Sequence, residues 1–428
     1  MIKLLRIIGA LVVLAIVGAV ILYIVGSRVG PIPAPTVDVA TLDEAARADL
    51  ISRGKAVAEA ADCSACHADP SGASSLGGGL PMKTGMGTIR ASNISPSTEH
   101  GIGKWSSDDL YIAMTRGITP DGGLLYPAMP YASFNAITRA DSDALYAWLM
   151  AQPPVEKPNE NHDLAFPFNL RFGVAFWNAL YRPAAEPFDA AVVQSPNPRG
   201  DYLVNVLGHC GECHTPRNFA FAMKRDQALQ GGVIEGAYAP DLTPAAMASR
   251  GWTEADLVQF LHSGLSPQGV MTLGMFPVLS HSTAWMPDED LKSISSYLLA
   301  GQATPGPVSR QPNGEPNAAG QVLYMGLCAG CHGPSGQGQP HSSVPLDVNT
   351  TAMFPNPINL IRVIHDGIPE RNLAHGERMQ TMPAFGAKLD TQQMADLVNY
   401  LRSEWGGQPG DVTAGQVTDA LKTINEAK

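Results

Sequence analysis

The N-terminal segment over 1–30 carries the strongest hydrophobic pattern in the chain. Lys3 and Arg6 precede an uncharged run of mostly Ile, Leu, Val, Ala and Gly over residues 7–27. About 20 apolar residues span the hydrocarbon layer of a bilayer as a helix. A cleaved signal peptide is the alternative, but its apolar core is normally shorter and a small-residue cleavage site follows closely. The pattern favours a retained anchor over 1–30 with a cytoplasmic N-terminus, because Lys3 and Arg6 outweigh Arg28.

After a Pro-rich spacer over 31–44, the pattern changes to short amphipathic helices separated by Gly- and Pro-rich loops. Ser106 and Asp109 form a capping box, which predicts a helix start, and Gly117 is suited to end the same helix. These signals predict a mainly α protein. Further helices are expected at 53–61, after the cap formed by Thr138 and Asp141, at 359–367 and across 396–401.

A Cys-x-x-Cys-His motif occurs three times, beginning at Cys63, Cys210 and Cys328. Two thiols so spaced at a helix start can each form a thioether to one porphyrin, and the His then offers its imidazole to the iron. Zinc half-sites or redox-active dithiols are the alternative. Three copies, each ending in His, favour three covalently bound haem c groups. The predicted attachment residues are Cys63, Cys66, Cys210, Cys213, Cys328 and Cys331, and the predicted proximal ligands are His67, His214 and His332.

The first two motifs belong to a duplicated segment. Three landmarks of the first region recur in the second at the same distance along the sequence: the first cysteine of the motif, a tryptophan at a helix start and a helix-ending glycine. An identical offset at three landmarks indicates duplication of one fold. The pairs are Cys63 and Cys210, Trp105 and Trp252, and Gly117 and Gly264.

These landmarks predict three consecutive class I cytochrome c-like haem domains preceded by one N-terminal transmembrane helix. The boundaries are 1–30 for the anchor, 31–44 for the spacer, 45–154 for the first haem domain, 155–198 for a linker, 199–303 for the second haem domain, 304–316 for another linker, 317–405 for the third haem domain and 406–428 for a polar tail. The tail is expected as a surface helix or a disordered segment. Aromatic residues in the 155–198 linker either pack across two haem domains or form a docking surface for a partner subunit.

The sixth iron ligand decides between an electron carrier and an enzyme. A Met thioether opposite the His gives a low-spin carrier with a raised potential, whereas a vacant position invites chemistry on small molecules. A Met followed by Pro in a loop between two helices is the expected pattern. It predicts Met129 in the first domain and Met382 in the third.

The second domain offers Met271, Met275 and Met286. The interval from His214 to Met275 is one position shorter than the interval from His67 to Met129 in the first domain. The interval to Met271 is five positions shorter, and the interval to Met286 is ten positions longer. The repeat therefore favours Met275.

Composition limits which partners the protein can bind and in which compartment it can lie. The net charge is −11, and six haem propionates would add to it, which makes nucleic acid an improbable partner. The six cysteines are all used by the motifs, so no thiol remains for a disulfide or a cysteine nucleophile. Because each domain also offers a Met for the sixth position, no catalytic site of the chain's own is expected. Because c-type haem is attached outside the cytoplasm, the haem domains are expected on the periplasmic face of a bacterial inner membrane.

Three stretches, at 208–218, 125–131 and 166–169, resemble the three-haem cytochrome c subunit of membrane-bound dehydrogenases of acetic acid bacteria. The resemblance covers about 45–405. It implies a separate large catalytic subunit that oxidises an alcohol, aldehyde or sugar with a molybdenum, PQQ or flavin cofactor, and a small iron–sulfur subunit is a further candidate. It also implies that this chain passes electrons through three haems to ubiquinone.

The N-terminal anchor and the polar tail look more like the form paired with molybdenum-dependent aldehyde dehydrogenase than the alcohol dehydrogenase form, which binds the membrane through its C-terminal region. Two other functions stay open. A peroxidase-like enzyme would need a haem without a sixth ligand, against which the Met in each domain argues. A haem subunit of a terminal oxidase would co-purify with a many-helix membrane subunit.

Overall fold

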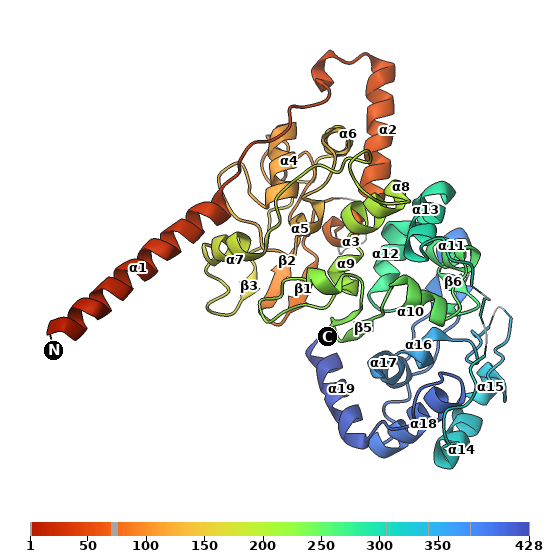
Figure 1. The fold of residues 1–428 in the computed structure, drawn as a ribbon. Coiled ribbons are helices and arrows are strands. Elements are labelled where there is room, and N and C mark those ends of the chain that lie inside the picture. The colour runs from red at the N-terminus through yellow and green to blue at the C-terminus, as the bar shows by residue number, and fades with distance from the viewer. Residues whose placement is uncertain are drawn as a thin grey trace. The chain divides into compact units, whose positions relative to one another are not determined.

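The computed structural model describes residues 2–69, 76–304, 306–307, 309–340, 342–376 and 378–427. The chain forms two compact units. The first comprises 1–194, 205–209 and 218–222, and the second comprises 195–204, 210–217 and 223–428. Helices predominate in both (Figure 1), which confirms the prediction of a mainly α protein. The stretches 45–154, 199–303 and 317–405 are called the first, second and third segments.

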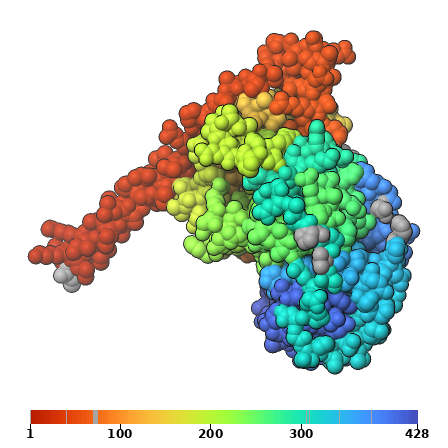
Figure 2. All heavy atoms as spheres, turned by 45° about the vertical axis from the view of Figure 1, so that its right-hand side comes forward, coloured from red at the N-terminus to blue at the C-terminus, as the bar shows by residue number. Residues whose placement is uncertain are grey.

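Helix α1, Ile2–Ser27, is the one helix among the described residues that is long and apolar enough to cross a membrane. Its apolar side chains are open over most of its length; Leu11, for example, is 60% exposed. Figure 2 shows it as a rod extending from the rest of the first unit. Its C-terminal end packs on α7, Gly173–Tyr181, so closely that a Cβ atom on Gly26 would meet the backbone of Ala175.

The described residues of the first segment form five helices and two strands of a small sheet, whose third strand comes from the linker that follows. The predicted capping box is present: Ser106 Oγ accepts a hydrogen bond from Asp109 N, and Asp109 Oδ2 accepts one from Ser106 N. Gly117 ends that helix at φ 65°, a left-handed conformation that favours glycine. The helices are α2 (Glu44–Ala60), α3 (Cys63–His67), α4 (Ser107–Arg116), α5 (Tyr131–Phe134) and α6 (Arg139–Met150), and the antiparallel strands are β1 (Pro81–Thr84), β2 (Gly87–Arg90) and β3 (Asp163–Leu164).

The second and third segments lie in the second unit except for two short stretches, and they repeat this plan with short hairpins. The second segment contains α8 (Pro198–Tyr202), α9 (Gly211–His214), α10 (Pro244–Ser249), α11 (Glu254–Ser263), α12 (Met275–His281), α13 (Asp288–Leu298) and the hairpins β4 (Gly232–Ile234) with β5 (Ala237–Ala239) and β6 (Leu265–Ser266) with β7 (Gly269–Val270). The third contains α14 (Ala318–Leu327), α15 (Ala329–His332), α16 (Thr350–Met353), α17 (Ile358–Asp366), α18 (Thr391–Glu404) and the hairpin β8 (Arg371–Asn372) with β9 (Arg378–Met379), and α19 (Ala414–Glu426) follows.

The same helix crossing occurs in all three segments. The helix before each motif packs on the closing helix: α2 on α6, α8 on α13 and α14 on α18. A glycine lies at each contact, and a Cβ atom on it would come within 2.0–2.3 Å of a carbonyl oxygen of the closing helix. Only a residue without a side chain permits such an approach. The glycines are Gly54, Gly200 and Gly320, and the facing oxygens belong to Ala144, Ser293 and Asp396.

The C-terminal tail joins the core of the third segment. Val417 and Ile424 of α19 are fully buried, together with Tyr324, Ile361 and Leu397 of the third segment. The tail therefore forms a helix, one of the two expected states, but its apolar side is packed and not left at the surface. Burying these side chains stabilises α19, which is too short to be stable alone.

Candidate functional site

Each Cys-x-x-Cys-His motif folds as a short helix, α3, α9 or α15, after the helix that crosses the closing helix. In the second segment a π-helical turn, Leu203–Leu207, lies between the two. His214 N donates a hydrogen bond to Cys210 O at 3.0 Å, and His332 N donates one to Cys328 O at 2.9 Å. The motif histidine thus lies one helical turn after the first cysteine. No disulfide joins the six motif cysteines.

One backbone carbonyl orients each motif histidine. A carbonyl oxygen only accepts hydrogen bonds, so the Nδ1 atom facing it must carry the proton. The lone pair then lies on Nε2, which is the nitrogen that could ligate an iron. The Nδ1–oxygen distances are 2.7 Å from His67 to Ser92, 2.7 Å from His214 to Pro240 and 3.1 Å from His332 to Val344.

The three imidazoles are suited to metal ligation. Burial lowers the pKa of His67, His214 and His332, and the hydrogen bond to the carbonyl raises it in part. The rings are therefore neutral at pH 7, the state that a ligand requires.

Four of the motif thiols are neutral as well. Burial raises the pKa of Cys63 and Cys213 to about 12 and that of Cys210 and Cys328 to about 11. Redox-active dithiols have lowered pKa values, so the raised values argue against that alternative. Neutral sulfurs next to a neutral, oriented imidazole fit a haem held by two thioethers.

The methionine candidates lie in the stretch of each segment that precedes the closing helix. Met129 lies between α4 and α5, Met275 begins α12, and Met382 follows β9. All three are partly exposed, whereas Met271 and Met286 are 1% and 7% exposed within the protein. Met129 and Met382 thus lie in loops of their segments, whereas Met275 is the first residue of a helix.

The backbone also relates the first two segments around their methionines. Leu125 N donates to Gly117 O at 2.8 Å, and Met271 N donates to Gly264 O at 2.7 Å. Met271 therefore occupies the position of Leu125. In both segments a methionine follows four residues later, which supports the assignment made from the spacing.

The third segment holds its methionine differently. Met382 pairs in antiparallel fashion with Ile368, with a 2.9 Å hydrogen bond in each direction. The hairpin formed by β8 and β9 lies between these two residues.

The carbonyls of Ser92, Pro240 and Val344 were missed by sequence reasoning. They follow their histidines by 25, 26 and 12 residues, so neither residue type nor spacing is constant. Every non-terminal residue carries such an oxygen, and no signal in the sequence singles these out.

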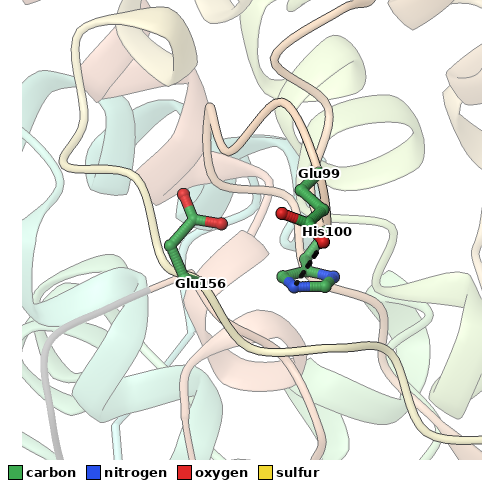
Figure 3. A group of neighbouring side chains, drawn as sticks. All are labelled: Glu99, His100 and Glu156. Carbon is green, nitrogen blue, oxygen red and sulfur yellow. Dashed lines mark ion pairs between the residues drawn. The ribbon is translucent and has the colours of Figure 1, made fainter.

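A separate group of polar side chains lies on two loops of the first unit. Among the described residues, Glu99, His100 and Glu156 are the one group of this kind whose metal-ligating atoms lie within 4.8 Å of one another (Figure 3). Both carboxylates are exposed, and Glu156 Oε2 accepts a hydrogen bond from Ser97 Oγ at 2.8 Å. The geometry is that of a solvated surface cluster, and no metal is assigned to it.

The motif helices, oriented histidines and glycine crossings define a c-type cytochrome, and residues 317–405 match the family model described as cytochrome c. The chain is 37% identical over 398 residues to the cytochrome c subunit of the quinone alcohol dehydrogenase of Gluconacetobacter polyoxogenes, covering 87% of this chain and 84% of that one. It is 34% identical over 417 residues to the gluconate 2-dehydrogenase cytochrome c subunit of Pantoea cypripedii, covering 90% and 92%. It is 35% identical over 407 residues to the fructose dehydrogenase cytochrome subunit of Gluconobacter japonicus, covering 87% and 82%. The chain belongs to this family of dehydrogenase cytochrome c subunits, and the resemblance seen in its sequence is confirmed.

Proposed function

We propose that the chain is the triheme electron-transfer subunit of a membrane-bound alcohol or aldehyde dehydrogenase, which delivers electrons from the catalytic subunit to ubiquinone. The observation that carries the proposal is a threefold recurrence. Each segment combines a Cys-x-x-Cys-His helix, a histidine held by a carbonyl through Nδ1, and a helix crossing at a glycine. Three repeats of one haem-binding plan support three haems.

The residues of each segment have distinct roles in this proposal. When bound, haem c supplies reversible one-electron oxidation and reduction of its iron. The two cysteines of a motif would hold it by thioethers, and the histidine Nε2 would ligate one side. Met129, Met275 and Met382 would ligate the other side and exclude small molecules. This donor set favours a carrier over a peroxidase-like enzyme.

A retained anchor is favoured over a cleaved signal peptide by the packing of α1. Asn178 Nδ2 donates a hydrogen bond to Gly26 O at 3.2 Å, and Arg182 Nη2 donates one to Arg28 O at 3.1 Å. Asn178 is 2% exposed, so cleavage after residue 26 would remove a partner from a buried polar group. We infer a single N-terminal anchor in the bacterial inner membrane, with the haem-binding part in the periplasm.

The substrate is a property of the partner. The three relatives are subunits of alcohol, gluconate and fructose dehydrogenases, so one cytochrome plan accompanies different catalytic subunits. A large catalytic subunit with a molybdenum, PQQ or flavin cofactor therefore fits this chain, with a small iron–sulfur subunit as an additional component.

Purification of the native complex tests the proposal. A tagged chain is isolated from membranes in mild detergent, the large partner is identified, and the haem spectrum is followed while candidate alcohols and aldehydes are added. The proposal predicts a dehydrogenase partner and haem reduction by its substrate. Isolation with a many-helix oxidase subunit would refute it, as would rapid binding of CO by the dithionite-reduced isolated chain or its turnover of hydrogen peroxide.

A further inference from the structure

Helix α7 carries an apolar stripe that the function described so far does not use. Phe172, Phe176 and Leu180 recur at a spacing of four residues, which places them along one face of this helix. Phe172 is 55% and Leu180 is 62% exposed. The opposite face of α7 is buried. Ala175 packs against α1, and Asn178 donates a hydrogen bond to the backbone of the last turn of α1.

The stripe continues the apolar surface of α1. The ring of Tyr23, three residues before Gly26, lies 6.5 Å from the ring of Phe176. Phe176 in turn meets Phe172 edge to face at 6.4 Å. Figure 1 shows α7 beside the C-terminal end of α1. A surface that covers the exposed side of α1 near Tyr23 therefore also contacts α7.

The turn before α7 adds more apolar surface to this patch. Phe166, Phe168 and Leu170 are 77%, 43% and 40% exposed. The turn is fixed to the body of the first unit, because Tyr126 Oη donates a hydrogen bond to Phe168 O at 2.9 Å. Large aromatic side chains held outward on a fixed turn are costly to leave in water.

The charges around the patch suit a lipid surface. The stretch from Leu164 to Arg182 contains no Asp or Glu, although the whole chain has a net charge of −11. It contains two arginines, Arg171 before α7 and Arg182 after it. Aromatic side chains with flanking arginines are typical of segments that lie in the interface between lipid and water.

We propose that α7 and the turn at 166–172 lie in the lipid–water interface of the membrane that α1 crosses. We assign the bilayer as the surface that covers this patch, because the patch is continuous with α1, whose exposed apolar side chains require lipid. The inference rests on the transmembrane anchor of the proposed function. It adds a second membrane contact, which would hold the first segment at the bilayer surface.

Site-directed spin labelling of the full-length holoprotein tests this contact. The six native cysteines are consumed as thioethers, so Phe172→Cys, Leu180→Cys, Val17→Cys and Val192→Cys each provide the one free thiol. The variants are placed in nanodiscs of phosphatidylethanolamine and phosphatidylglycerol, and label collision rates with oxygen and with a water-soluble nickel chelate are compared. Val17 reports the anchor, and Val192, an apolar residue that is 73% exposed outside the patch, is the matched control.

The expected ratio of oxygen to nickel collisions at residues 172 and 180 is several-fold above that at 192 and below that at 17. Values at 172 and 180 equal to the control, with residue 17 in lipid, would overturn the interface contact and leave the anchor intact. A water-exposed label at residue 17 would overturn both the contact and the proposed anchor. The covalent haem spectrum of each variant verifies that it is folded.

Discussion

The first two segments and the third share one helix crossing but differ around the motif. The residue before the first cysteine is left-handed in the first two segments, with φ of 53° at Asp62 and 36° at His209. In the third segment it is Leu327, the last residue of α14. The methionine loops differ as well: two segments share a register after a helix-ending glycine, and the third pairs Met382 with Ile368.

The difference separates what haem attachment requires from what it leaves variable. The glycine crossing, the motif helix and the carbonyl-bound histidine recur in all three segments. In the proposed function the methionine would only have to bring a sulfur to the open side of an iron, which loops of different length can do.

The largest expected effect comes from removing one attachment site. Cys328→Ala combined with Cys331→Ala should leave the third segment without a covalent haem, because no thioether can form there. The haem count should fall from three to two, as measured by intact mass and by the haem absorbance per chain. Cys210→Ala with Cys213→Ala is the matched variant and should also lose one haem. If the third-segment variant keeps its full haem content, the equivalence of the segments is wrong.

Next in size is the loss of a sixth ligand in the second segment. Met275→Leu should lower the potential of one haem by on the order of 0.2 V and open it to CO, since a thioether ligand raises the potential. Met286→Leu should do neither, because that side chain is 7% exposed and lies two residues before the closing helix. Redox titration and CO binding check both variants. If Met286→Leu lowers the potential and opens the haem to CO while Met275→Leu does not, the ligand is Met286. The methionines of the first two segments would then not occupy equivalent positions.

The helix crossing should respond to a single methyl group. In Gly320→Ala the new Cβ would lie 2.1 Å from Asp396 O, so the helices must separate. The free energy of unfolding should drop by about 3 kcal/mol. Gly326→Ala on the same helix meets nothing within 4 Å and should be neutral or stabilise by about 0.5–1 kcal/mol. Guanidinium unfolding of both variants measures the contrast, and equal effects would contradict a close crossing.

A smaller effect concerns the left-handed residue of the first segment. Asp62 Oδ1 is buried without a hydrogen-bond partner, and burial raises the pKa of this carboxyl to about 8. The pKa of the Asp62 carboxyl is higher in the folded protein than in the unfolded chain. Its contribution to the free energy of unfolding therefore falls as the pH rises from about 4 to about 8, and is constant above that. Asp62→Asn, which also tolerates a positive φ, should therefore stabilise the protein by on the order of 2 kcal/mol at pH 8.

At pH 4 the same substitution should change little, because the carboxyl is then largely protonated in the folded state. Unfolding followed at the first haem at both pH values tests this dependence. An equal gain at pH 4 and pH 8 would show that the charge is not the cause.

Much of the architecture could be predicted from local signals. The capping box at Ser106 and Asp109 and the motif helices depend on residues a few positions apart, which a sequence displays directly. The crossing glycines could not be recognised, because the carbonyl that each one faces belongs to a helix far along the chain. The packing of α19 was missed because polar side chains predominate in this helix, although the buried Val417 and Ile424 lie seven residues apart on one face.

The candidate site divides in the same way. The proposed thioether and imidazole positions were predicted from one short motif, whereas the carbonyl that orients each imidazole depends on how a distant loop folds. The choice among three methionines in the second segment required the repeat, and the backbone register around Gly264 supports it.

The most direct test of the central claim is the intact mass of the purified full-length chain. Three Cys-x-x-Cys-His helices that each hold one haem predict a mass equal to the polypeptide plus three haem groups, all resistant to acid and organic solvent. A mass with two haems, one or none would contradict the claim that the three segments are equivalent haem-binding domains.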